Sequence, residues 1–169
     1  GMNICVAGLV NESIVDGPGF RFAIFTQGCP HRCPGCHNPQ THDFAGGTDT
    51  DCAQLLARID ANPLLDGVTF SGGEPFCQAS VLAELGAKLR QRGLNIITYT
   101  GFTYEKLLED ANQENGYRAL LEVTDYLVDG RFEQDKKSYE LHFKGSSNQR
   151  FIDVQKSLES GSTVVLESL

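Results

Sequence analysis

Four short segments of β-strand composition, each followed directly by a glycine-containing turn, constrain the fold of this chain more than any other feature. They cover residues 21–26, 67–70, 95–100 and 126–128. Apolar residues recur at helical spacing between the later segments, over about 77–92 and 104–122. Strands that alternate with helices in this way form parallel βαβ units.

The fold class that follows is α/β, with an open sheet that forms a partial (βα) barrel. The chain has 169 residues, whereas a closed barrel of eight units takes roughly 250 residues. We expect a single domain over residues 1–169, in which Gly1, ahead of Met2, is a tag remnant. The other expected elements are a strand pair within about 3–15, a helix capped by Asp51, a helix over about 151–159 and a last strand over 163–166.

The polar and glycine-rich turns are expected to meet at one rim of the sheet. A cysteine-rich loop, the turn at 71–75, the pair Thr100-Gly101 and the pair Asp129-Gly130 each follow a predicted strand. Ligands of open α/β sheets bind at the carboxyl ends of the strands. This rim is therefore the candidate functional site.

The cysteine-rich loop carries the strongest chemical signal. Cys29, Cys33 and Cys36 are spaced CxxxCxxC, and they are half of the six cysteines in the chain. Cysteines clustered in a reducing compartment indicate a metal site rather than disulfides. A [4Fe–4S] cluster usually takes four thiolates. Three thiolates would leave one iron open to a small molecule, as in catalytic metal sites.

A structural zinc site or a redox module is the alternative for this loop. The fourth zinc ligand would then be His31, His37 or Cys52. Zinc sites of this type pair a CxxC with a second pair of ligands further along the chain, and no such second pair follows here.

Composition restricts the partners of the chain. The net charge is −8 and the sequence pI is about 4.9, which disfavours nucleic acid, because nucleic-acid binding depends on Lys and Arg at phosphates. The start of the chain lacks the pattern of a signal peptide. No stretch approaches the ~20 apolar residues of a membrane helix. We therefore expect a cytoplasmic protein that binds neither nucleic acid nor membrane.

The combination of CxxxCxxC after one strand and Gly-Gly-Glu-Pro after the next resembles the radical S-adenosylmethionine superfamily. Within it, the chain is similar to the activases of glycyl radical enzymes, above all those of anaerobic ribonucleoside-triphosphate reductase. The similarity covers about residues 13–153. The motifs that carry it are DGPGFR at 16–21, FTQGC at 25–29, CHNP at 36–39, YLVDGRF at 126–132 and KGSSNQR at 144–150.

The resemblance implies which residues hold which group. Cys29, Cys33 and Cys36 would ligate three irons of a [4Fe–4S] cluster, and S-adenosylmethionine would chelate the fourth. Residues 72–75 would hold its methionyl amine. The residues expected to contact S-adenosylmethionine are Gly35, Cys36, His37, Gly72, Gly73, Glu74, Pro75, Thr100, Asn148 and Arg150. Gly35 stands where many superfamily members place an aromatic residue on the adenine, so that stacking contact is missing here.

The resemblance also implies the reaction. One electron from the reduced cluster would break a C–S bond of S-adenosylmethionine, giving methionine and a 5′-deoxyadenosyl radical. The radical would take a Cα hydrogen from the glycine loop of the partner reductase. A donor such as flavodoxin or ferredoxin would supply the electron, and no side chain is expected to act as acid or base. The alternatives within the superfamily are an activase of the pyruvate formate-lyase type and an enzyme that acts on a small molecule.

Overall fold

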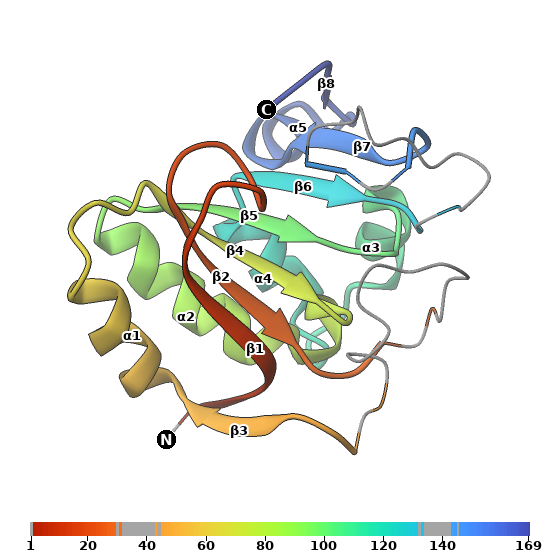
Figure 1. Ribbon diagram of the computed structural model, residues 1–169. Coiled ribbons are helices and arrows are strands. Elements are labelled where there is room, and N and C mark those ends of the chain that lie inside the picture. Colours follow the sequence, from red (N-terminus) through yellow and green to blue (C-terminus); the bar gives the residue numbers. More distant parts are fainter. Residues whose placement is uncertain are drawn as a thin grey trace.

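A single mixed sheet forms the centre of the molecule (Figure 1). The computed structural model describes residues 2–29, 31, 43, 45–131, 133, 143–144 and 146–169. Within these residues eight strands form one sheet in the order β3-β1-β2-β4-β5-β6-β7-β8. The strands are β1 (Asn3–Ser13), β2 (Arg21–Thr26), β3 (Thr48–Asp51), β4 (Gly67–Gly72), β5 (Asn95–Tyr99), β6 (Tyr126–Asp129), β7 (Arg150–Asp153) and β8 (Val165–Leu166).

The parallel centre of this sheet confirms the α/β class. Strands β2, β4, β5 and β6 run parallel to one another, while β1, β3, β7 and β8 add antiparallel strands at the two sides. The described helices are α1 (Cys52–Asp60), α2 (Ala79–Gln91), α3 (Tyr104–Asp110), α4 (Tyr117–Val123) and α5 (Val154–Ser160). A 3₁₀ turn at Pro75–Gln78 precedes α2. No described helix is both long and apolar enough to span a bilayer.

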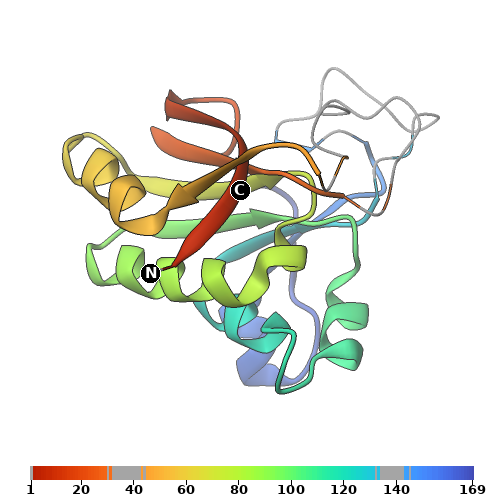
Figure 2. The same ribbon diagram turned by 90° about the horizontal axis from the view of Figure 1, so that it is seen from below.

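Alternation along the strands separates the two faces of the sheet. Phe22, Phe70 and Ile96 belong to the main apolar core, which they share with helix residues such as Leu82 and Leu85. Full burial of each such side chain contributes roughly 1.5–3 kcal/mol. Helices α2 and α4 lie side by side beneath this face (Figure 2). The opposite face has no described helix over it, and it is called the open face below.

Three predicted elements differ from the structure. The helical stretch over 104–122 is two helices, because Asn112 and Asn115 bond back to the main chain and Gly116 turns the chain with φ of +73°. The helix expected from residue 151 begins only at Val154, after the antiparallel strand β7. The region 3–15 holds one long strand rather than a strand pair, and its partners are β2 and β3.

Candidate functional site

The turn after β4 packs main chain against main chain. The Gly73 amide donates to the Thr26 carbonyl at 2.8 Å, and the Glu74 amide donates to the Gly28 carbonyl at 2.7 Å. A Cβ on Gly72 would lie 2.4 Å from the Thr26 nitrogen, and one on Gly73 would lie 2.3 Å from the Gly28 oxygen. Gly72 also has φ of +97°. Only glycine permits this approach, which places the turn beside the start of the cysteine loop.

The Glu74 carboxylate lies fully buried under this turn and accepts hydrogen bonds from four groups. His31 Nε2 is 2.7 Å from Oε1, and the Gly101 amide donates to the same oxygen at 2.8 Å. The Thr100 hydroxyl is 2.9 Å from both oxygens, and the Phe76 amide donates to Oε2 at 3.1 Å. His31 of the cysteine loop, the 71–75 turn and Thr100-Gly101 thus meet at one carboxylate.

His31, inside the cysteine loop, is confined on several sides. Its side chain is only 4% exposed. Its ring meets the Phe102 ring edge-on with 4.6 Å between centroids, and it lies so close to Gly101 that a Cβ there would be 2.4 Å from Cδ2. Nδ1 is buried and has no hydrogen-bond partner among the described residues. Most buried polar atoms have a partner, so the partner of Nδ1 is to be sought outside the described residues.

The far end of the cysteine loop is also fixed. The Gln27 side-chain amide donates to the Asp43 carbonyl at 2.6 Å, and the Gln27 main-chain amide donates to the Cys5 carbonyl at 3.0 Å. Gln78 adds a second clamp, because its side chain accepts from the Cys5 amide and donates to the Cys5 carbonyl. Gln27, at the start of the loop, is therefore attached both to β1 and to Asp43 at the far end of the loop.

Only the first cysteine of the motif lies among the described residues. Cys29 is 8% exposed, whereas Cys33, Gly35, Cys36 and His37 lie outside the described part of the chain. Within the described residues no group of three metal-ligating side chains occurs. The three-cysteine ligand set and the contacts of residues 35–37 with adenine therefore stay predictions.

The cysteines outside the motif have other surroundings. Cys52 begins α1 and belongs to the main apolar core, where burial raises the pKa of its thiol. The Cys5 thiol contacts the Gly46 carbonyl at 3.3 Å. The position of Cys52 in the core gives no support to its role as a fourth zinc ligand.

Asp129, the next predicted rim position, is a buried carboxylate that forms an ion pair with the partly exposed Arg150. Its carboxylate accepts from the Tyr104 amide at 2.8 Å and from Arg150 Nε at 3.0 Å. The other side of the Arg150 guanidinium bonds to Glu105 at 2.7 and 3.2 Å. The hydrogen bond from Arg150 lowers the pKa of Glu105 to about 2, and its two carboxylate partners raise the pKa of Arg150.

The last two residues expected at the cofactor both bond within the chain. Arg150 makes the two ion pairs just described. Asn148 accepts from the Ser146 hydroxyl at 2.6 Å and donates to the Arg131 carbonyl at 2.9 Å. Any contact of these two side chains with S-adenosylmethionine stays a prediction.

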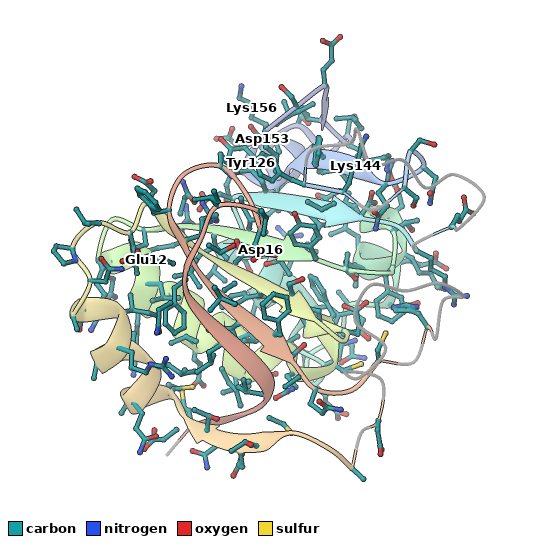
Figure 3. The ribbon with its side chains drawn as sticks, viewed as in Figure 1. Glu12, Asp16, Tyr126, Lys144, Asp153 and Lys156 are labelled. Atoms are coloured by element: carbon teal, nitrogen blue, oxygen red, sulfur yellow. The ribbon has the colours of Figure 1, made fainter. Side chains whose placement is uncertain are left out.

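The open face holds a buried cation that the sequence reasoning did not identify. Arg21 is fully buried and donates to the Thr69 hydroxyl at 2.8 Å and the Val68 carbonyl at 2.9 Å. Burial lowers its pKa to about 10. The Thr69 hydroxyl in turn donates to the Asp16 carbonyl at 2.8 Å, so the DGPG turn lies over this face (Figure 3). An arginine two residues after that turn, at the start of a strand, was the available signal.

The residues present fit an iron–sulfur cluster with S-adenosylmethionine. A buried thiol, a turn packed main chain against main chain and a buried imidazole nitrogen without a described partner lie at the rim. Thiolates are the usual ligands of such clusters. The fold and the rim are compatible with an iron–sulfur protein, and the comparison with known families gives that class. Over residues 15–152 the chain matches the family described as the 4Fe-4S single cluster domain.

Individual relatives make the family more specific. An anaerobic ribonucleoside-triphosphate reductase-activating protein from Pasteurella multocida is 34% identical over 144 residues, which are 80% of this chain and 89% of that protein. The chain belongs to this family of activating proteins, within the 4Fe-4S single cluster domain family. A pyruvate formate-lyase-activating enzyme from Clostridium pasteurianum is 32% identical over 153 residues, or 87% of this chain and 60% of that protein.

Among solved structures, QueE from Escherichia coli matches 61% of this chain and 55% of its own, with a TM-score of 0.47 and 22% identity. A likeness this partial is not informative about function.

Proposed function

We propose that this chain is a radical S-adenosylmethionine activase that generates a glycyl radical on an anaerobic ribonucleoside-triphosphate reductase. The observation that carries the proposal is the contact between the Gly-Gly-Glu-Pro turn and the cysteine loop, joined through Glu74 and His31. The names of the relatives support the choice of partner. When bound, the cluster and S-adenosylmethionine supply the electron transfer and the radical, which side chains cannot provide.

The chain holds and orients these groups. Cys29, Cys33 and Cys36 would hold the cluster at three irons. Residues 72–75 would hold the methionyl amine through main-chain carbonyls, since no described residue donates to the Gly73 carbonyl. Arg21 keeps the DGPG turn over the open face, which places that turn where it can meet the glycine loop of the partner.

An activase of the pyruvate formate-lyase type is the second candidate, because one such relative is 32% identical. That relative has a further two-fifths of chain that this one does not match. The two candidates differ in the partner on which the radical forms. We place the protein in the cytoplasm, where a flavodoxin or ferredoxin could reduce the cluster and unpaired thiols persist.

Anaerobic reconstitution tests the proposal. The wild-type protein should bind about four irons and four sulfides, as a [4Fe–4S] cluster requires, and with a strong reductant should convert S-adenosylmethionine to methionine and 5′-deoxyadenosine. Mixing with the candidate reductase should give a glycyl radical signal in electron paramagnetic resonance (EPR). A protein that binds one zinc and does not cleave S-adenosylmethionine would overturn the proposal.

Replacement of one cysteine separates a catalytic cluster from a structural one. We predict that Cys33→Ala abolishes cleavage and leaves the circular dichroism spectrum and the unfolding transition close to those of the wild type. The reason is that the two described residues of the loop, Cys29 and His31, lie outside the main apolar core. Global unfolding of this variant would mean that the cysteines are structural.

A further inference from the structure

We infer that Glu74 and His31 form a brace that sets the cysteine loop against the Gly-Gly-Glu-Pro turn, and that both are positioning residues for the proposed reaction. This inference rests on the proposed function, because it concerns the distance between the group held by the loop and the group held by the turn. The brace is the 2.7 Å contact between His31 Nε2 and Glu74 Oε1.

The Glu74 carboxylate is saturated by the chain itself. A carboxylate has about four acceptor positions, and four groups donate to this one: the His31 ring, the Thr100 hydroxyl and the amides of Phe76 and Gly101. Its side chain has no exposed surface. The acidic side chain of the turn therefore faces inward, where it holds the surrounding segments together rather than contacting a ligand.

His31 links the buried Glu74 carboxylate to the cysteine loop. It lies two residues after Cys29 and two before Cys33, in the middle of the CxxxC spacing. Contacts with Glu74, Phe102 and Gly101 leave its ring no room to rotate. A ring held in this way fixes the position of His31 itself, which lies between the first two predicted ligands in the sequence.

The buried Nδ1 atom gives a second, independent reason to place His31 at the site. It has no described hydrogen-bond partner although its side chain is almost completely enclosed. With Nε2 committed to Glu74, Nδ1 is the ring atom available to a group bound at the rim. The imidazole would then contact the carboxylate on one side and the bound group on the other.

Removal of the brace should misplace the bound S-adenosylmethionine while the protein stays folded. The contact is a buried hydrogen bond to a charged group, and loss of one partner leaves the other unsatisfied. Misplacement of reacting groups by about 1 Å can lower a rate by about a hundredfold. The expected effect is weaker productive binding of S-adenosylmethionine at an otherwise complete cluster.

The test compares reconstituted His31→Ala, His31→Gln and wild-type proteins. The measurements are iron per chain, the S-adenosylmethionine concentration that half-saturates the change in the EPR spectrum of the reduced cluster, and kcat and KM for cleavage. His31→Ala should keep about four irons and need about tenfold more S-adenosylmethionine. His31→Gln, whose amide can still donate to Glu74, should stay within about threefold of the wild type.

Two threonines provide a matched pair of further variants. Thr100→Val removes one donor to Glu74, whereas Thr98→Val removes an equally buried hydrogen bond to Thr124, at 2.9 Å, that does not involve Glu74. Thr100→Val should raise the half-saturating concentration by about threefold, and Thr98→Val should leave it unchanged. If His31→Ala does not retain the cluster, the comparison of Thr100→Val with Thr98→Val tests the role of the brace instead.

Several results would overturn the brace. One is a half-saturating S-adenosylmethionine concentration in His31→Ala equal to that of the wild type. The others are equal increases of this concentration in His31→Ala and His31→Gln, or equal increases in the two threonine variants. A wild-type protein whose spectrum does not respond to S-adenosylmethionine would instead refute the proposed function, so the two failures are distinguishable.

Discussion

The replacement of Gly72 by alanine tests the main-chain cradle most severely. Gly72 has φ of +97°, and an added Cβ would lie 2.4 Å from the Thr26 nitrogen and 2.7 Å from two main-chain carbons of Phe25. The left-handed conformation alone costs an alanine about 1 kcal/mol. The steric conflict adds roughly 1–3 kcal/mol, because the neighbouring atoms belong to a buried strand and cannot move aside cheaply.

Gly93 offers the matched control. It has φ of +79°, but nothing lies within 4 Å of its hypothetical Cβ. Gly93→Ala should therefore lose only the conformational part, about 1 kcal/mol, which lowers the melting temperature of a chain of this size by about 2–4 °C. Gly72→Ala should lose about 3 kcal/mol and about 6–12 °C.

Thermal unfolding followed by circular dichroism, with both variants in the same reconstitution state, measures this difference. The binding of S-adenosylmethionine should weaken in Gly72→Ala and stay unchanged in Gly93→Ala. Equal melting temperatures for the two variants would refute the claim that the 72–75 turn is packed main chain against main chain.

Two further predictions concern ionisable groups. In Arg150→Met the hydrogen bond that stabilises the Glu105 carboxylate is lost. The folded-state pKa of Glu105 is about 2, below its ordinary 4.5. The stabilisation is therefore present above pH ~4.5 and disappears as the pH falls through ~2. The difference in unfolding free energy between wild type and variant, measured by urea titration of the apoprotein, should therefore shrink across this window, and a pH-independent difference would contradict the assignment. Cys77 lies at the surface but should react with iodoacetamide at pH 8 more slowly than a free cysteine, because desolvation and the nearby Glu74 carboxylate raise its pKa to about 11. Mass spectrometry in native buffer and in urea measures this, and equal rates in the two would contradict it.

Much of the parallel centre could be predicted from the sequence, because strand composition and the turns that end strands are local signals. The helix after Asp51 is an example: the Asp51 carboxylate caps it by accepting from the Ala53 amide at 2.9 Å. Strand β3 was missed, since its sequence Thr-Asp-Thr-Asp has no apolar alternation and its order comes from pairing with β1. The break before α4 was missed although residues 112–116, Asn-Gln-Glu-Asn-Gly, carry no apolar side chain, which is a local signal of a turn.

The composition of the rim could be predicted, whereas the direction of its side chains could not. Sequence spacing brought Glu74 and Thr100 to the same rim, where both were expected at the cofactor. A sequence does not indicate whether a carboxylate in a turn faces outward or into the protein, and the structure shows the four donors that hold Glu74 inside. The role of His31 depends on the same long-range contact, 43 residues apart along the chain.

The measurement that tests the account most directly is electron–nuclear double resonance on the reduced, reconstituted protein with S-adenosylmethionine labelled with ¹⁵N at its amine. A cluster ligated by three cysteines should show hyperfine coupling between its unpaired spin and that nitrogen. The coupling should be absent when the labelled compound is left out. A cluster whose fourth iron carries a protein ligand, with no coupling to the amine, would contradict the account.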